Sequence, residues 1–479
     1  MSTVISESMI YSLPTELLSD IASFLSSHDL FRVALVSRKW RDIAEPYLYH
    51  TYRSPSMSSA RRRDGRPSGP PFRLFLRRLI EQPDFAVNVR RLDLQRWSTL
   101  FNIQIPGFLP PNPSQEDLQA ALTAAKACKL VSEDASLDLG LKEGEVLFPK
   151  LLGFSGAAID PTDGKPWQEK WLRQLHAGLD DPLVILMVAL LHRVEEIRID
   201  ENPFKSLSWQ VLENVPHGFA HLRKLWISSA KTTFPGYASL LSSPAMQVFE
   251  SWNTTDDHNR TTWTFPASSS PVREVILESF YVQSSTLNSL IECFKALTTF
   301  SLYIDNFMDH NTVSQLPKIA NYLASHKATL RHLRLEAARN AWAEQLNLRD
   351  FDEVYVLAVS TSFSYRSLQE TSCPFPASLR SLLLVLDNFN AGASGFQEYL
   401  EHLYPMLGYM PFLKRIDFEI RQGSMYVNDL ETFKSRCSSH DVQVEWYDSG
   451  FWSAHSHPTL DKFRSLVKGY GVSGTALET

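Results

Sequence analysis

The sequence predicts an α+β protein in which a small N-terminal unit of three short helices precedes an irregular α/β solenoid with a curved parallel sheet. Two patterns lead to this prediction. Apolar residues recur at helical spacing over residues 13–48. From residue 89 onward a short apolar motif returns, mostly at intervals of about 24–33 residues, as in stacked strand–helix units. With 479 residues, 44% of them hydrophobic, the chain can bury a large core.

The charge and cysteine content argue against several function classes. The formal net charge is −6, so the composition favours binding neither to nucleic acid nor to an anionic membrane. The start of the chain lacks the pattern of a signal peptide, and the longest apolar run, residues 183–191, is shorter than the roughly 20 residues that span a bilayer. The cysteines lie far apart, without a CxxC pair. We therefore expect reduced thiols and a protein of the cytoplasm or the nucleus.

The first helix is predicted over about residues 13–25. Pro14 suits the first turn, where its missing N–H is no loss, and Glu16 suits the positive end of the helix dipole. The apolar residues that follow recur at helical spacing and are expected to form one face, which consists of Leu17, Leu18, Ile21, Phe24 and Leu25.

Two further short helices follow. Asp29 is expected to cap the second helix, which continues through Val36, and Ser37 is expected to cap the third. A unit of about forty residues buries too little apolar surface to be comfortably stable alone, so part of that surface should pack against a partner. The alternative is that the apolar residues form only the unit's own core, or dock onto the rest of the chain.

This segment carries a string of spaced residues that differ in their chemistry. They are Leu13, Pro14, Glu16, Leu18, Ile21, Phe24, Leu25, Asp29, Leu30, Val36, Ser37, Lys39, Trp40 and Arg41. This string resembles an F-box, although that family often has Cys where Ser37 stands. The resemblance implies binding to the Skp adaptor of a cullin-based ubiquitin ligase and, through it, to the cullin scaffold. Phe24, Val33 and Ala34 are expected to hold the helices together. The candidate contacts to the Skp adaptor are Leu13, Pro14, Leu17, Leu18, Ile21, Leu30, Val36 and Trp40.

Four segments are predicted along the chain. The F-box spans residues 10–50. Residues 51–88 form a short strand and a flexible linker, since residues 54–71 are rich in Ser, Gly, Pro and Arg. A repeat region for binding a target spans residues 89–447, and a C-terminal tail spans residues 448–479.

The repeated motif has an apolar residue, two others, an apolar residue, one other and usually another apolar residue. Its copies begin at Val89, Phe148, Val194, Leu222, Met246, Val272, Leu297, Leu330, Val354, Leu379 and Leu413. The last positions alternate between apolar and polar, as in a strand with one buried face, and the segments between copies have helical patterns. The pattern resembles the leucine-rich-repeat family, although only Asn202 meets the Asn or Cys that this family places at the ninth position. The alternative is a generic α/β domain with strands at this spacing.

The third, fifth and seventh positions of each copy are expected to point away from the core, onto the concave face of the sheet. Exposed Trp, Tyr and Arg side chains are frequent interface anchors. The candidate target-binding residues are therefore Trp226, Trp252, Tyr303 and Arg334. The alternative for each is that a neighbouring loop covers the side chain. The mixed charge along this face favours a protein ligand over a polyanion.

The sequence carries no recognisable catalytic motif. The segment GFSGA at Gly153 lacks the spacing of a nucleophile elbow, and the histidines of residues 455–457 lack a third ligand at zinc-site spacing. We therefore expect a protein that is not an enzyme and holds no cofactor or metal. The predicted function is a substrate adaptor of an SCF-type ubiquitin ligase that recruits an unknown protein target. The alternative is a scaffold that binds the Skp adaptor without ubiquitylation.

Overall fold

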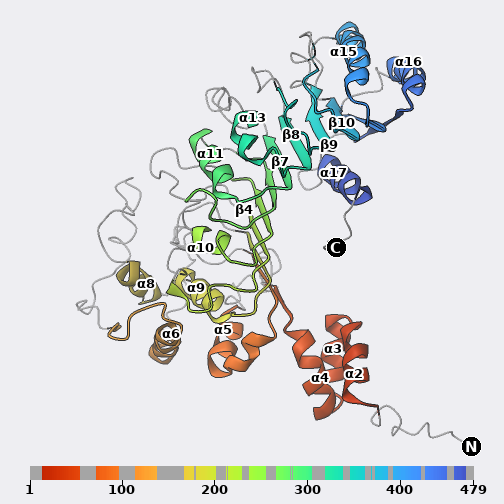
Figure 1. The fold of residues 1–479 in the computed structure, drawn as a ribbon. Coiled ribbons are helices and arrows are strands. Elements are labelled where there is room, and N and C mark those ends of the chain that lie inside the picture. Colours follow the sequence, from red (N-terminus) through yellow and green to blue (C-terminus); the bar gives the residue numbers. More distant parts are fainter. Residues whose placement is uncertain are drawn as a thin grey trace, which may run out of the picture. The chain divides into compact units, whose positions relative to one another are not determined.

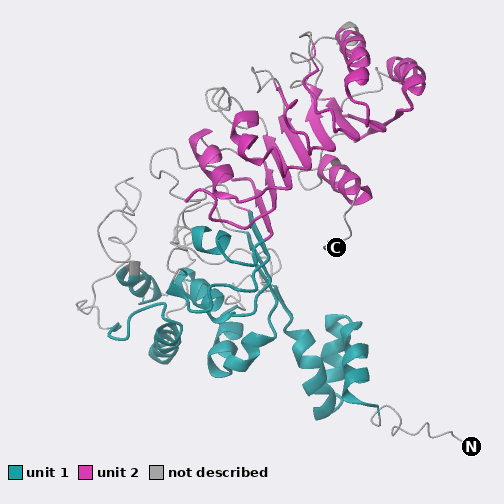
Figure 2. Ribbon diagram, in the orientation of Figure 1, with its two compact units in different colours: residues 1–227, 236–246 teal, residues 228–235, 247–479 magenta. Residues whose placement is uncertain are grey.

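The computed structural model describes residues 13–53, 72–95, 114–137, 167–176, 180–200, 212, 214–228, 237–254, 266–280, 282, 284–304, 319–337, 346–361, 368, 373–386, 392–421, 427–449 and 458–470. The chain divides into two compact units (Figure 2). Unit 1 comprises residues 1–227 and 236–246, and unit 2 comprises residues 228–235 and 247–479.

The described part of unit 1 begins with three short helices (Figure 1), namely α2 Thr15–Ser23, α3 Ser27–Ala34 and α4 Arg38–Leu48. The three predicted helices are therefore confirmed. Ser37 caps α4 as predicted, because its Oγ accepts a 3.2 Å hydrogen bond from the backbone N–H of Trp40. The predicted cap of α3 is wrong. Ser26 is the cap and accepts from the backbone N–H of Asp29 at 3.2 Å, while the Asp29 carboxylate accepts a 2.6 Å bond from the Ser26 hydroxyl.

These helices pack around a small core of their own, formed by Leu18, Ala22, Leu30, Ala34, Trp40, Ile43 and Ala44. The partly buried Leu13, Leu25 and Val33 pack against this core. Ser19 Oγ and Tyr47 Oη lie 2.8 Å apart and join α2 to α4. All three helices thus contribute to one core.

Unit 1 continues with parallel strands, which are β1 Thr51–Arg53, β2 Arg91–Gln95, β3 Glu196–Asp200 and β4 Lys224–Ser228. In the register, Thr51 pairs with Arg91, and Arg91 in turn pairs with Glu196. The other described elements of this unit are α5 Phe72–Glu81, η1 Pro83–Val87, α6 Gln115–Ala127, α8 Trp167–His176, α9 Asp181–Leu190 and α10 Ala238–Leu241. Both α5 and η1 lie within residues 51–88, the span that the sequence assigned to a strand and a linker.

The described part of unit 2 contains eight strands, β5 Val248–Trp252, β6 Glu274–Glu278, β7 Thr299–Ile304, β8 His332–Ala337, β9 Val356–Ser360, β10 Ser381–Leu386, β11 Arg415–Ile420 and β12 Gln443–Asp448. Neighbouring strands from β5 to β12 pair in parallel. For example, Ser381 pairs with Val356 on one side and with Arg415 on the other. The side chains of β7, β9 and β10 are buried on both faces. The sheet of this unit is therefore covered on both sides along its central strands.

The described helices of unit 2 are α11 Ser284–Cys293, α13 Ile319–Tyr322, η5 Leu323–His326, α15 Gly392–Met406, η6 Leu407–Tyr409, α16 Val427–Cys437, η8 Ser438–His440 and α17 Pro458–Gly469. Helix α17 lies within the predicted C-terminal tail, and it is on the side of the strands opposite to α11 and α13 (Figure 1). Within the described parts of both units, no helix is both long and apolar enough to cross a bilayer.

The predicted repeat positions coincide with strands. Each copy among the described residues begins two residues before a strand, as Val194 precedes Glu196 of β3 and Leu379 precedes Ser381 of β10. The copy at Phe148 lies outside the described residues. The described residues after α4 are therefore α/β, with twelve parallel strands whose order follows the sequence.

Candidate functional site

Charged side chains are buried on one face of the sheet in unit 2. Arg334 of β8 is fully buried, and its guanidinium forms ion pairs with Glu278 of β6 and Glu336 of β8. Arg421, which directly follows β11, donates to Glu336 at 2.6 Å and to Glu419 at 3.0 Å. These five side chains alternate in charge, and we refer to them as the buried ion-pair network.

Glu278 and Glu336 differ in the net shift of their pKa. Burial raises the pKa of Glu278 to about 7, because desolvation outweighs the attraction of Arg334. Burial also acts to raise the pKa of Glu336, but this carboxyl contacts both Arg334 and Arg421, which hold its pKa below the ordinary value. The pKa of Glu278 thus lies near neutral pH, whereas the pKa of Glu336 lies below its ordinary value.

Glu278 should make the stability of unit 2 depend on pH. Its pKa is about 7 in the folded protein against an ordinary value of 4.5, so its contribution is fully present below pH 4.5 and is lost as the pH rises through 7. The loss in the free energy of unfolding should reach up to about 3 kcal/mol. Denaturation experiments between about pH 5 and pH 8 should show that the free energy of unfolding of the wild type falls as the pH rises. The fall should be smaller in Glu278→Gln. The exposed control Glu353→Gln should keep the wild-type slope, and equal slopes in all three proteins would contradict the prediction.

The four predicted target-binding residues lie in different environments. Arg334 is fully buried and Tyr303 is 6% exposed, so the expectation that both are exposed anchors is wrong. The reason is that Arg334 pairs with two carboxylates, and its guanidinium lies 5.9 Å from the Tyr303 ring. Trp252 is half-buried and packs against an apolar cluster that includes side chains of α17. Trp226, in unit 1, is half-buried, and the Arg198 guanidinium lies 4.0 Å from its ring centroid.

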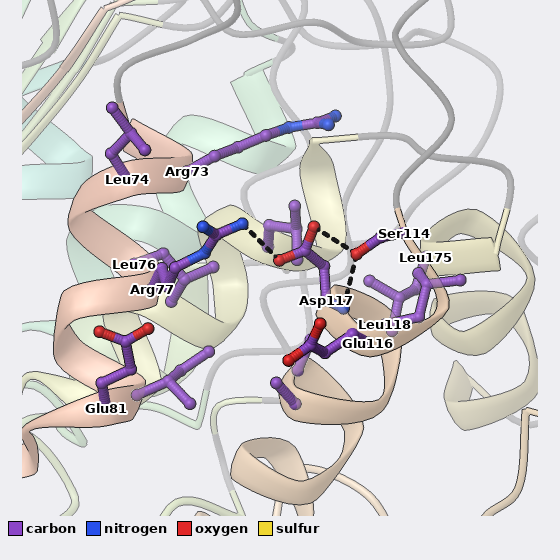
Figure 3. A pocket seen from close by; sticks show the side chains of 14 residues that line it. Arg73, Leu74, Leu76, Arg77, Glu81, Ser114, Glu116, Asp117, Leu118 and Leu175 are labelled. Carbon is purple, nitrogen blue, oxygen red and sulfur yellow. Dashed lines mark hydrogen bonds and ion pairs between the residues drawn. The ribbon is translucent and has the colours of Figure 1, made fainter.

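A pocket of about 280 Å³ lies in unit 1 between α5 and α6 (Figure 3). The Arg77 guanidinium and the Asp117 carboxylate form a 2.7 Å ion pair there, and the Ser114 hydroxyl donates to Asp117 at 2.7 Å. Arg73 pairs at 2.7 Å with Asp180, which is fully buried. Both arginines are therefore paired with an aspartate. In the described parts of the chain, no three His, Cys, Asp or Glu side chains are grouped to hold a metal ion.

The ion pair of Asp180 was not foreseen from the sequence. Asp180 and Asp181 stand together at the start of α9, in a context that suggests turn residues, where Asp is common for backbone reasons. Asp180 makes no side-chain capping bond and instead pairs with Arg73, which is 107 residues away. A contact at this separation leaves no local signal in the sequence.

Helix α2 carries two apolar stripes instead of the single predicted face. Leu18 and Ala22 are fully buried in the core of the three helices. Leu17, Ile21 and Phe24 recur at the same helical spacing but lie on the outside, where 49%, 43% and 88% of each is exposed. The expectation that Phe24 holds the helices together is therefore wrong.

Helix α3 and its end add further exposed apolar side chains. Phe31 and Leu35 are one helical turn apart and are 58% and 65% exposed, and the adjacent Val36 is 63% exposed. Phe31 and Leu35 are not among the contacts predicted from the sequence, although their spacing of four residues is a usable signal. We call the complete set the exposed apolar surface; it consists of Leu17, Ile21, Phe24, Phe31, Leu35 and Val36.

The predicted contacts to the Skp adaptor divide into three groups. Pro14, Leu17, Ile21 and Val36 are exposed. Leu13 is partly buried against the core of the three helices. The remaining candidates are core residues of these helices and are not available on the surface, because they are at most 8% exposed; these are Leu18, Leu30 and Trp40. Lys39 Nζ donates to the Leu13 carbonyl at 3.3 Å, which ties the Leu-Pro start to α4.

Comparison with known families identifies this part of the chain. Residues 10–53 match the family model described as F-box-like. This segment is an F-box-like domain. A search of curated proteins finds no match to the chain. The F-box-like domain covers the three helices and ends with β1.

The last element of the F-box-like domain is also the first strand of the parallel sheet. The Arg53 Nε on β1 donates to Asp93 of β2 at 2.9 Å. The Tyr52 ring stacks on Phe75 of α5 with centroids 4.1 Å apart, and the Tyr49 ring meets Phe85 of η1 edge-on at 4.7 Å. The F-box-like domain and the sheet of unit 1 are thus joined through a shared strand and packed aromatic rings.

Proposed function

We propose that this protein is a non-catalytic substrate adaptor of a cullin-based, SCF-type ubiquitin ligase in the cytoplasm or the nucleus. The F-box-like domain would bind the Skp adaptor and, through it, the cullin scaffold, while the region after it would bind a protein target. The observation that carries this proposal is the exposed apolar surface. Six large apolar side chains on a domain with so small a core are typical of a surface that a partner covers.

The proposed mechanism is proximity. A target held by the sheet-containing region would have its lysines close to the activated ubiquitin that the ligase carries, at a raised effective concentration. This role requires no catalytic side chain in the adaptor itself; one surface that binds the Skp adaptor and another that binds the target are sufficient.

We also propose that the strand–helix units are irregular leucine-rich repeats. The parallel strands follow one another in sequence order, and the apolar motif precedes each described strand from β2 to β11 at the same offset. The asparagine ladder of the family is lacking in the sequence, so the turns after the strands would be stabilised in other ways.

Binding to the Skp adaptor should depend on the outward stripe of α2. Ile21→Asp combined with Phe24→Asp is expected to weaken this binding at least about thirtyfold, because a charge is placed at each of two contact positions. Both side chains are exposed, so the variant should keep its fold. Co-purification of the full-length protein with the Skp adaptor, followed by titration calorimetry, measures the effect.

The matched control is Leu74→Asp, which charges a side chain that is 70% exposed on α5, outside the F-box-like domain. It should bind the Skp adaptor like the wild type. Retained binding in the Ile21→Asp, Phe24→Asp protein would remove this stripe from the interface. The ligase role has a separate readout: inhibition of the cullin ligase should raise the level of a captured target, and an unchanged level would indicate a scaffold.

A further inference from the structure

The C-terminal helix α17 covers part of the polar face of the sheet in unit 2 (Figure 1). Its apolar side chains recur along one side of the helix, and Leu460, Phe463 and Leu466 are 1%, 1% and 7% exposed. They form one apolar cluster with four side chains of the sheet, which are Ile276, Val356, Ala358 and Leu383. These sheet residues stand at the motif positions that the sequence placed on the ligand-binding face.

Ionic contacts hold the same helix on both sides of its apolar stripe. Arg464 Nη2 lies 2.9 Å from a carboxylate oxygen of Glu250 on β5, and Lys462 Nζ lies 3.1 Å from one of Asp417 on β11. The side chains of both acids are at least nine-tenths buried. The helix therefore presents cations where the sheet presents buried carboxylates.

The sheet face is acidic without this helix. Among the described residues of unit 2, the buried charged side chains are five carboxylates and two guanidiniums, which are Glu250, Glu278, Glu336, Asp417, Glu419, Arg334 and Arg421. The partly exposed Arg415 also pairs with Asp417 at 2.6 Å. The cations of α17 thus compensate an excess of buried negative charge, and anything that replaces α17 must do the same.

We propose that this face is a binding surface for a basic amphipathic helix of a partner protein, and that α17 is its built-in occupant. The partner helix would carry apolar residues at positions i, i+3 and i+6, like Leu460, Phe463 and Leu466, with Lys or Arg at i+2 and i+4, like Lys462 and Arg464. It would replace α17 on the sheet. The identification of this partner as a ligase target rests on the proposed function, whereas the binding itself does not.

The covalent connection of α17 sets the strength of the competition. Only residues 449–457 lie between the end of β12 and the start of α17. A connection of this length holds a segment near its site at an effective concentration on the order of millimolar. A separate helix of similar intrinsic affinity therefore binds weakly to the intact chain and much more tightly once α17 is loosened.

A labelled peptide of residues 458–470 tests this proposal by fluorescence anisotropy. It should bind the full-length variant Lys462→Ala, Phe463→Ser, Arg464→Ala at least about tenfold more tightly than the wild type. The control variant Ser465→Ala, Lys468→Ala alters the exposed side of α17 and should behave like the wild type. A peptide with Lys462→Glu and Arg464→Glu should not bind. Equal affinity for both chains, binding of the charge-reversed peptide, or no binding to the loosened chain would each overturn the proposal.

A second measurement uses the wild-type chain, in case the loosened variant does not fold. An unlabelled peptide of residues 458–470 is added in large excess before hydrogen exchange. It carries Ser465→Ala, so that its fragments differ in mass from those of the chain's own α17. Exchange at residues 458–470 of the chain should rise while β9 and β10 stay protected. Continued protection of α17 at peptide concentrations well above millimolar would overturn the proposal. Neither experiment includes the Skp adaptor, so failure here and failure of Skp binding are separate results.

Discussion

Replacing Arg334 with methionine is expected to lower the free energy of unfolding of unit 2 by about 3–5 kcal/mol. The guanidinium is fully buried between Glu278 and Glu336, and methionine removes the charge while keeping an unbranched side chain. Glu278 would then lose its ion pair with Arg334, and Glu336 would lose one of its two arginine partners and keep Arg421. The buried carboxyls would thus lose charge compensation that their burial requires. Urea unfolding of the full-length protein, followed by circular dichroism, measures this loss.

The matched control is Arg331→Met, which makes the same substitution at an exposed arginine just before β8. It should change the free energy of unfolding by no more than about 0.5 kcal/mol. A triple variant with Glu278→Gln, Arg334→Met and Glu336→Gln should regain part of the stability lost in Arg334→Met, because it removes the two buried carboxyls that had lost the guanidinium. If Arg334→Met is as stable as the wild type, the network does not stabilise unit 2.

Replacing Trp40 with alanine is expected to destabilise the F-box-like domain by about 3–5 kcal/mol. Trp40 is 8% exposed and is one of the seven buried residues of the domain's core. Because so small a core gives only a small free energy of unfolding, this loss should unfold the three helices locally. Limited proteolysis should then cleave residues 13–48 rapidly, and binding to the Skp adaptor should be lost together with the fold.

The control is Phe31→Ala, which shortens an aromatic side chain of the same domain that is 58% exposed. It should leave protease resistance unchanged, since removing an exposed side chain opens no cavity. If Trp40→Ala stays resistant to protease while it loses the Skp adaptor, Trp40 is a contact residue and not a core residue. The comparison thus separates loss of binding through unfolding from loss of a contact.

Much of the fold could be predicted because its signals are local. Helical spacing identified α2, α3 and α4, and the period of the apolar motif placed the described strands from β2 to β11. The division of α2 into an inward and an outward stripe could not be predicted, because Leu17 and Leu18 are equally apolar and only the packing of α3 and α4 decides which one is buried.

The burial of Arg334 could not be predicted from the sequence, for a different reason. Alternation along β8 correctly places it on the face opposite to Leu333 and Leu335. An arginine at such a position is normally exposed, but here Glu278 is 56 residues before it, and Arg421 reaches the shared Glu336 from 85 residues beyond. No pattern within one repeat contains these contacts.

The link between Arg421 and Glu336 has a consequence for how unit 2 loses its structure. In an array where each strand touches only its neighbours, unfolding can start at an end and proceed stepwise. Arg421 follows β11 and pairs with Glu336 on β8, so it bridges across β9 and β10. Glu278 on β6 is connected to the same chain through Arg334. Fraying at β11 therefore breaks contacts several strands away, which makes the loss of strands β6 to β11 cooperative instead of gradual.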